Sequence, residues 1–501
     1  MSEFLEHPIF KRFYEISQIP RESSHTEQIS LFLEEFGRRN GHRVSRDKAG
    51  NVVIFREASK GYENAPVVML QGHMDMVCVR TADSDHDFRK DPIRFVERDG
   101  MLYADHTSLG SDDGMAVAYM MEILSNPSIE APALECVITV DEEIGLLGAE
   151  ALEDFGSRAE YLINLDNEEE HHFCVSCAGG RQVNIRRNPD WPFVVVTDDP
   201  DREPDKRKLL SVEVSGFLGG HSGSNIIKRG GNADIVMARV LFAADEAFAQ
   251  KEEHPLFLIQ SIHGGTADNV IPNRCRAVIL SDDGEEAERI MRRAFEEICE
   301  ELKEFEPVKP VLTVNELEKK YPCSFINPFD TAEMLYLLTE IPNGIRYMDE
   351  NIPGLVSTSC SLGILNLDAA DEKPSLEAVI CLRSNVRARK EELTDEIDKV
   401  VNEYGGITFL TGDYPQWEFR KESELRNIME EIHVKLYGEP PVWEAIHAGL
   451  ECGIFSEKMP GLDIVSIGPD LLDIHSVEEH ADIASCIRTY EYLLEVLKNI
   501  K

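Results

Sequence analysis

Three absences narrow the classes of protein to which this sequence can belong. Positive charge is scarce, with 51 Lys and Arg against 93 Asp and Glu, so the formal net charge is −42. A field of that sign repels nucleic acid and anionic lipid, and we expect neither as a partner. No apolar run approaches the ~18 uncharged residues of a membrane span. The opening stretch MSEFLEHPIFKRFYE lacks the basic start and the apolar core of a signal peptide.

Clustered cysteines are also missing. The eleven cysteines are odd in number and scattered, mostly within apolar segments such as those around Cys136 and Cys381. This pattern indicates reduced, buried thiols, so we expect a cytoplasmic protein. Cys174 and Cys177 form a lone CxxC pair, and without a second pair nearby a structural zinc there is the less favoured interpretation.

The first part of the chain alternates strand and helix patterns. With 501 residues, 42% of them apolar, the chain can form two to four domains with large cores. Strand-like runs alternating with helical periodicity favour an α/β domain, with a mostly parallel central sheet flanked by helices. The strand-like runs are 52–55, 67–71, 134–140 and 161–165, and the helical ones are 114–125 and 145–155.

A change of composition follows this part. Segment 188–208 carries four prolines and a run of charges, which is typical of a linker or a surface excursion. Strand and helix patterns then resume in a strand–helix–strand order. We infer an α+β middle domain over 186–414, which leaves 1–185 and 415–501 outside it.

Polar side chains follow three of the predicted strands of the first part. The run VVML leads into His73 and Asp75, VITV leads into Glu142 and Glu143, and INL leads into Asp166. Ligands bind at the carboxyl ends of strands in open α/β sheets. We therefore expect one histidine and several carboxylates to share one edge of the sheet.

Two further residues can join that edge. Asp112, in SLGSDDG, directly precedes the helical run, and His475 lies in the late segment DIHSVEE. Ser476 and Glu479 fit a capping box, with serine at the N-cap and glutamate at N3. This pattern predicts that His475 lies on a loop leading into a helix.

Carboxylates crowded on one edge repel one another unless divalent cations lie among them. Carboxylates with imidazoles favour zinc, manganese or cobalt, and two metals about 3.5–4 Å apart need a bridging anion, for which Asp112 is suited. Asp75 can accept the second ring N–H of His73. Adjacent Glu142 and Glu143 point apart, so one can bind metal while the other takes a proton from water. Each motif alone is also typical of an ordinary loop or turn; the set indicates metal-assisted hydrolysis.

The ordered motifs QGHMDMV, SLGSDDG, TVDEEIG, INLDNEEE, CAGG and DIHSVEE resemble those of the co-catalytic zinc metallopeptidases. More narrowly, the sequence resembles the aminoacyl-histidine (Xaa-His) dipeptidases of carnosinase type. GGHSGSNI, TADNVIPN and IHAGLECG extend the resemblance over nearly the whole chain. It implies hydrolysis of the amide bond of dipeptides, with two Zn²⁺ per chain, Co²⁺ or Mn²⁺ as substitutes, and a homodimer.

The resemblance also implies metal ligands. His73 and Asp166 would hold one zinc, Glu143 and His475 would hold the other, and Asp112 would bridge them. Residues 1–185 and 415–501 would then form one discontinuous catalytic domain, with 186–414 inserted as a lid.

The remaining roles also come from the resemblance. Glu142 would be the general base and Asp75 the partner of His73, and His221, Asn269 and Arg383 would bind substrate from the lid.

Two alternatives stay open. A related N-acyl amino acid deacylase or tripeptidase would share the metal centre, and a catalytically degenerate relative would be a binding module. The intact Glu142 argues against the degenerate form. Val477 stands where the resembling group has proline, and 188–208 is unusually long and acidic, so substrate choice can differ.

Overall fold

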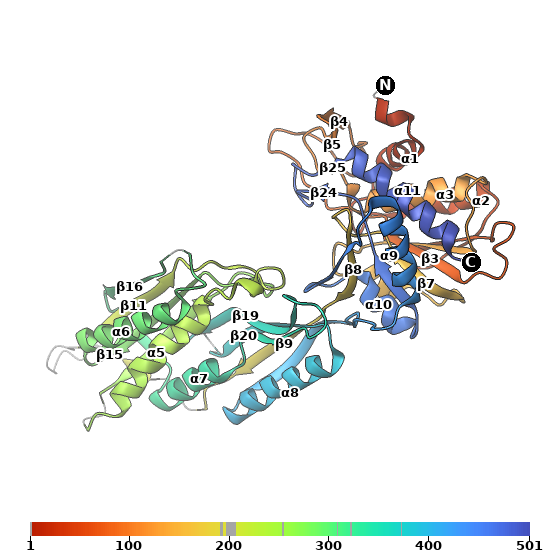
Figure 1. Cartoon of the computed structure of the whole chain (residues 1–501). Helices are drawn as coiled ribbons and strands as arrows, with labels where there is room; N and C mark the ends of the chain where they lie inside the picture. Colours follow the sequence, from red (N-terminus) through yellow and green to blue (C-terminus); the bar gives the residue numbers. More distant parts are fainter. Residues whose placement is uncertain are drawn as a thin grey trace. The chain divides into compact units, whose positions relative to one another are not determined.

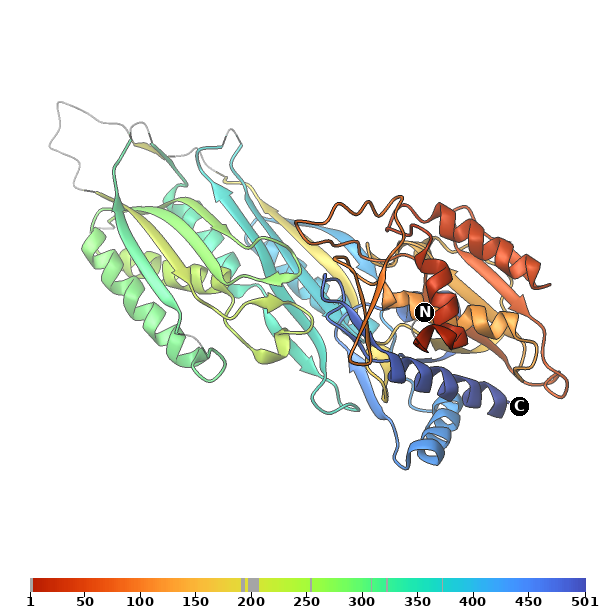
Figure 2. The ribbon, with the colours of Figure 1, turned by 90° about the horizontal axis from the view of Figure 1, so that it is seen from above.

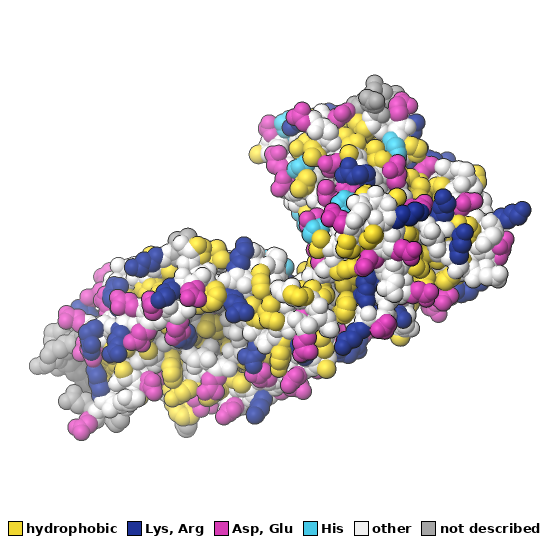
Figure 3. Space-filling model, viewed as in Figure 1, with side chains coloured by type: hydrophobic (Ala, Val, Ile, Leu, Met, Phe, Trp, Pro, Cys, Tyr) yellow, Lys and Arg dark blue, Asp and Glu magenta, His cyan; other side chains and the backbone are white. Residues whose placement is uncertain are grey.

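The structure is a computed structural model that describes residues 3–190, 194–196, 207–252, 255–307, 309–320, 323–371 and 373–501. The chain divides into two compact units (Figure 1). The first comprises Met1–Cys177, Trp417–Ala445 and Leu450–Lys501, and the second comprises Ala178–Gln416 and Ile446–Gly449. Asp and Glu side chains are spread over the drawn face of both units (Figure 3), as the net charge requires.

The first unit is built on an eight-stranded sheet in the order β1-β2-β6-β3-β7-β23-β8-β22. The central strands β6, β3, β7 and β23 run parallel, whereas β1, β2 and β8 pair antiparallel at the flanks. The strands are β1 (Arg43–Arg46), β2 (Val52–Arg56), β3 (Val67–His73), β6 (Leu134–Thr139), β7 (Ala159–Asn164), β8 (His172–Cys177), β22 (Val442–Ile446) and β23 (Asp463–Ser466).

A single apolar cluster joins this sheet to five helices. Helix α3 lies against β3 and is buried along nearly its whole length, which explains why its sequence is apolar on every side. The helices of the cluster are α1 (Pro8–Ser17), α2 (Glu27–Arg39), α3 (Ser111–Ser125), α9 (Glu424–Tyr437) and α11 (Ile483–Asn499). Among the described residues, no helix has both the length and the apolar composition needed to span a bilayer.

Shorter elements complete the first unit. Helices α4 (Leu147–Ala151) and α10 (Glu451–Lys458) contact each other, and α10 also contacts β23. Helix α4 is shorter than the predicted helix over 145–155. A small sheet has the order β24-β25-β5-β4. The remaining elements are η1 (Glu3–Glu6), β4 (Phe95–Arg98), β5 (Met101–Ala104), β24 (Leu471–Leu472) and β25 (His480–Asp482).

The second unit is built on a nine-stranded sheet in the order β16-β11-β15-β13-β19-β20-β9-β21, with β18 paired to β19. Every pair in this sheet is antiparallel. Its strands are β9 (Gly179–Arg187), β11 (Lys208–Ser215), β13 (Phe257–Gly264), β15 (Arg274–Ser281), β16 (Val311–Leu317), β18 (Gly344–Met348), β19 (Val356–Asp368), β20 (Leu376–Ser384) and β21 (Ile407–Tyr414).

Four helices pack with this sheet around a second apolar core (Figure 2). They are α5 (Ala233–Ala249), α6 (Gly284–Leu302), α7 (Pro328–Glu340) and α8 (Arg387–Glu403). Two short ribbons accompany the sheet, β10 (Val194–Val196) with β17 (Cys323–Phe325), and β12 (Gly220–His221) with β14 (Val270–Ile271). A short helix, η2 (Ile226–Lys228), follows β12.

The predicted fold class is confirmed. The first unit is α/β, with a central sheet that is mostly parallel, and the second unit, whose residues interrupt those of the first in the sequence, is α+β. The predicted boundary at 185 falls inside β9, whose partners β20 and β21 place that strand in the second unit. Of the predicted linker 188–208, residues 191–193 and 197–206 lie outside the described residues, and 194–196 form β10.

Candidate metal centre and active site

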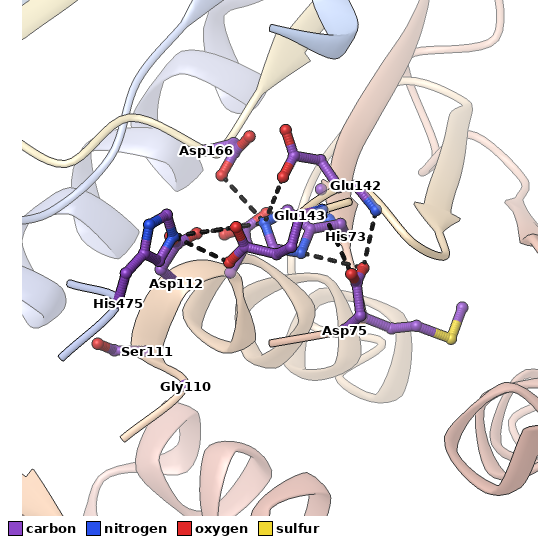
Figure 4. A network of polar contacts seen from close by, with 12 residues as sticks. His73, Asp75, Gly110, Ser111, Asp112, Glu142, Glu143, Asp166 and His475 are labelled. Carbon is purple, nitrogen blue, oxygen red and sulfur yellow. Dashed lines mark hydrogen bonds and ion pairs between the residues drawn. The ribbon is translucent and has the colours of Figure 1, made fainter. Parts of the chain in front are cut away.

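The carboxyl ends of the parallel strands bring the predicted polar residues together. His73 is the last residue of β3, Asp166 follows β7 by two residues, and the turn after β6 carries Glu142 and Glu143. β3 lies between β6 and β7, and all three run in the same direction. Their ends therefore share one edge, where Figure 4 shows these side chains pointing toward one another.

His73 lies at the middle of this group and is 1% exposed. Its Nε2 is 3.2 Å from Asp112 Oδ1, 3.5 Å from Asp166 Oδ1 and 3.9 Å from Glu142 Oε2. On the other side of the ring, Nδ1 is 3.4 Å from Asp75 Oδ1. Asp75 thus faces the ring nitrogen that points away from the carboxylate group, in the position that fixes an imidazole's orientation.

Asp112 lies between two histidines. Its Oδ1 faces His73, and its Oδ2 is 3.1 Å from His475 Nε2. The residue is in the non-helical first turn of α3, and the peptide bond that follows it is cis. The two oxygens of one carboxylate therefore each face a different imidazole (Figure 4).

The adjacent glutamates have different neighbours. An oxygen of Glu143 lies 3.0 Å from His475 Nε2. Among the described residues, the imidazole nitrogen nearest to the Glu142 carboxylate is His73 Nε2, at 3.9 Å. Their backbone is held by Asp75, whose carboxylate accepts the N–H of Glu142 at 3.2 Å and that of Glu143 at 3.4 Å. One carboxylate thus fixes the turn that points the two side chains apart.

The electrostatics of this edge are those of crowded acids. Burial, with the nearby charges of Asp166, Glu451 and Glu143, raises the pKa of Glu142 well above its usual range. Burial and the charges of Asp112 and Glu143 raise the pKa of Asp166 to about 6.

The pKa of His475 is also raised, which for an imidazole favours the charged form. Hydrogen bonds to Asp112 and Glu143 raise the pKa of His475 to about 11. Burial alone would raise the pKa of Asp112, but its bonds with His475 and His73 outweigh burial and lower it. The contact between Asp112 and His475 thus contributes to the pKa shifts of both residues.

The residues present fit divalent cations. Three overlapping groups place one ligand atom from each member within 4.8 Å of the others: His73 with Asp113 and Asp166, His73 with Glu142 and Glu143, and Asp112 with Glu143 and His475. Imidazole nitrogens and carboxylate oxygens without thiolates form the donor set of zinc, cobalt or manganese sites with hydrolytic chemistry. Cations here would also offset the repulsion between the acids.

The predicted capping box at Ser476 is wrong. No helix begins there, because α11 starts at Ile483 with Asp482 as its N-cap. Ser476 Oγ donates to the carbonyl of Asp473 within a tight turn, and His475 itself has a φ of 60°. The sequence pattern is typical of a helix start, but in the structure the Glu479 side chain accepts hydrogen bonds from the backbone of Leu109 and Ser111.

Two buried acids near the site were not singled out from the sequence. Asp113 Oδ2 accepts the N–H of His73 at 3.1 Å, and it fills the space that a side chain at Gly72 would take. Glu451 at the start of α10 accepts hydrogen bonds from Gln71 and Thr139. Asp113 follows Asp112 directly, but nothing in the sequence indicated that Asp112 faces the His73 ring while Asp113 accepts the backbone N–H of His73. Glu451 lies in IHAGLECG, where the resemblance covered the segment without assigning a residue.

The predicted lid residues lie in the second unit. His221 Nε2 is 3.4 Å from a terminal nitrogen of Arg383, and the other terminal nitrogen of Arg383 donates to the Tyr414 hydroxyl at 2.8 Å. Arg383, on β20, is buried, with 6% of it exposed. Asn269 meets this region through its backbone carbonyl, which accepts the N–H of Ser222 at 2.8 Å.

His447 joins these residues and was missed from the sequence. Its Nε2 lies 2.7 Å from Ser359 Oγ. Burial, with the positive charges of Arg383 and His221, lowers the pKa of His447 to about 3. Two histidines and a buried arginine are thus gathered in one part of the second unit.

The sequence of this chain is similar to those of known proteins. The model of "Peptidase family M20/M25/M40" matches residues 69–499. The cytosol non-specific dipeptidase of Escherichia coli (strain K12) is 31% identical over 502 residues, covering 100% of this chain and 99% of that protein. The chain belongs to peptidase family M20/M25/M40. It is therefore a hydrolase of the metallopeptidase class.

Two further comparisons bear on the family. The crystal structure of aminoacylhistidine dipeptidase from Vibrio alginolyticus has a TM-score of 0.89 and 27% identity, covering 100% of this chain and 98% of that one. Acetylornithine deacetylase of Myxococcus xanthus is 29% identical over 280 residues, covering 52% of this chain and 62% of that protein. A dipeptidase and, over about half of the chain, a deacetylase are thus similar to this protein.

Proposed function

We propose that this protein is a metal-dependent dipeptidase that hydrolyses the amide bond of dipeptides, with a preference for a C-terminal histidine. The observation that carries the proposal is the Asp112 carboxylate between His73 and His475, with oxygen–nitrogen distances of 3.2 and 3.1 Å. A carboxylate in this position suits two cations side by side. The similarity to the two dipeptidases over essentially the whole chain supports the substrate class.

We assign the metal ligands as the resemblance implies. His73 and Asp166 would hold one Zn²⁺, Glu143 and His475 the second, and Asp112 both; Co²⁺ or Mn²⁺ would fit the same donors. When bound, the ions supply Lewis acidity, which stabilises negative charge on the scissile carbonyl oxygen and favours ionisation of water.

The chain's own residues would then move the proton and hold the geometry. Glu142, which has no close imidazole partner, accepts a proton at its carboxylate from the attacking water and returns it to the departing amine nitrogen. Asp75 keeps the His73 ring in place through Nδ1 and holds the backbone of the turn that carries Glu142. These two contacts keep the base and the ligand at a constant separation.

We propose that His221, Asn269 and Arg383 bind the peptide, with the second unit acting as a lid. A buried arginine paired with a histidine is suited to a carboxylate or a developing oxyanion. The proximity of His447 to Arg383 and His221 supports adding it to this set.

The deciding experiment is a substrate panel on zinc-reconstituted protein. Xaa-His dipeptides should give the highest kcat/KM, followed by other dipeptides. Tripeptides test for a tripeptidase, and N-acetyl amino acids test for a deacylase. The highest kcat/KM on either of these two substrate classes would overturn the proposal. No turnover on any arm with two ions bound would indicate a binding module.

We further propose that the protein acts in the cytoplasm and forms a homodimer. All eleven cysteines are free thiols in the structure, and most are buried, which suits a reducing compartment. Fractionation of cells and light scattering on the purified protein test these two statements separately.

A further inference from the structure

Glu479 is a buried carboxylate that the proposed reaction does not use. It is 3% exposed and lies four residues after His475, at the end of the tight turn that carries that histidine. Its Oε2 accepts the backbone N–H groups of Leu109 at 2.9 Å and Gly110 at 3.1 Å. Its Oε1 accepts both the N–H and the hydroxyl of Ser111 at 2.8 Å. Three consecutive N–H groups thus surround one carboxylate, as in anion-binding backbone nests.

The loop that Glu479 holds ends at the proposed bridging ligand. Ser111 directly precedes Asp112, and Figure 4 shows Gly110 and Ser111 leading to Asp112 beside His475. The turn with His475 continues from Glu479 into β25, which pairs with β5, and β5 leads into this loop. The turn and the loop are therefore neighbours in a sheet, and the carboxylate links them again at the site.

Arg21 holds the same loop from a second direction. It is 2% exposed, and its terminal nitrogens donate to the carbonyls of Gly110, Met74 and Asp75. Gly110 has a φ of 69°, and a Cβ there would overlap both Arg21 and Met76. The loop before Asp112 is thus fixed through its N–H groups by Glu479 and through a carbonyl by Arg21.

We propose that Glu479 is a positioning residue that sets the separation of Asp112 and His475, and with it the affinity of the metal ion that these two residues would share. The inference rests on the proposed function, because it presupposes the metal assignment. It also explains the partners of Glu479: a glutamate needed only to start a helix would not bond a loop about 370 residues away in the chain, as the sequence separations of 368 to 370 show.

The test is zinc binding by Glu479→Gln, which is nearly isosteric but places an amide NH₂ against backbone N–H groups. Changes to residues that orient metal ligands weaken metal binding about 10–100-fold. We expect that loss for one of two ions, measured by titrating metal-free protein with zinc against a chromophoric chelator, and recovery of activity with excess zinc. Glu478→Gln is the matched control: Glu478 is exposed and adjacent, and its variant should bind both ions as the parent does.

A second variant covers the case in which Glu479→Gln does not fold. Ser111→Ala removes only the hydroxyl bond, and a single hydrogen bond is worth about two- to tenfold in an equilibrium constant. The weakening should fall on the same ion. Unchanged affinity for both ions, with only a lower free energy of unfolding, would show a merely structural role and overturn the proposal. Zinc binding is read without substrate, so failure of the dipeptidase proposal would show separately, as two bound ions without turnover.

Discussion

Asp234 allows a test of the second unit in which no metal takes part. It is the second residue of α5, it is fully buried, and the Cys275 thiol lies beside it. A side chain at Gly264 would overlap its carboxyl group, so the packing is close. Burial raises the pKa of Asp234 from 3.8 to about 7, which means that the folded protein holds this proton at pH values where the unfolded chain has lost it.

The sign and size of the effect follow from this shift. Between about pH 4 and pH 7 the native state binds more protons than the unfolded state, so the free energy of unfolding falls as pH rises. Below this window both states are protonated and the carboxyl group costs nothing through ionisation. Above it the full cost applies, which at about 1.4 kcal/mol per pKa unit is about 4 kcal/mol for the shift from 3.8 to about 7.

The experiment compares Asp234→Asn with the parent by chemical unfolding between pH 5 and pH 8. Because other titrating groups are common to both proteins, the difference in unfolding free energy isolates this residue. It should change by about 3 kcal/mol across the range, in favour of the variant as pH rises. Glu246→Gln, an exposed acid on the same helix, is the control and should show no such trend. A pH-independent difference for Asp234→Asn would refute the reasoning.

Three further outcomes are expected. Glu142→Gln should keep both metal ions and bind dipeptide with a near-normal KM, but its kcat should fall about 10²–10⁴-fold. Glu143→Gln should lose a metal ion as well as activity. Elemental analysis with steady-state kinetics distinguishes the two variants, and the reverse pattern would exchange the roles of the two glutamates. Dialysis against a chelator should abolish turnover and lower the unfolding temperature, with zinc restoring both, because the crowded carboxylates lose their counter-charge. Gly468→Ala should destabilise the fold by about 1–3 kcal/mol, measured by chemical unfolding, because a Cβ there overlaps the carbonyl of Asn167; wild-type stability would show that this backbone can shift.

The residues at the strand ends could be placed from the sequence because they depend on one simple regularity. Parallel strands end at one edge, and each of three apolar runs was followed directly by acids or a histidine. The structure brings His73, Asp75, Glu142, Glu143 and Asp166 together in this way. Neither the order of the strands nor the distances were needed to expect this grouping.

The residues that depend on long-range packing were not accessible in the same way. Glu451 approaches Gln71 and Thr139 across 380 and 312 positions of the chain. His447 approaches Ser359 across 88 positions. Neither residue belongs to a periodic pattern, and a buried glutamate has no local signature that separates it from an exposed one. Their roles follow from tertiary contacts, which only the folded chain shows.

The position of the unit boundary also depends on contacts between distant segments. Composition changes at the prolines of 188–208, and the predicted boundary lies just before them. Pairing decides the matter, because β9 bonds to β20 and β21 rather than to any strand of the first sheet. The middle segment likewise alternates strands and helices, yet its sheet is antiparallel throughout. Element order constrains the class of a fold more than it constrains the direction of each strand.

The spacing between His475 and Glu479 carries a constraint that neither residue carries alone. His475 faces the oxygens of Asp112 and Glu143, while Glu479 holds the N–H groups that lead into Asp112. Both bonds must form from one turn, in which His475 itself has a positive φ. A helix starting at Ser476 would coil the intervening residues, whereas the extended approach to β25 brings the carboxylate to the loop at 109–111. The capping-box pattern therefore misleads here because Glu479, its second residue, holds a loop from a distant segment of the chain. That tertiary contact outweighs the local preference for a helix.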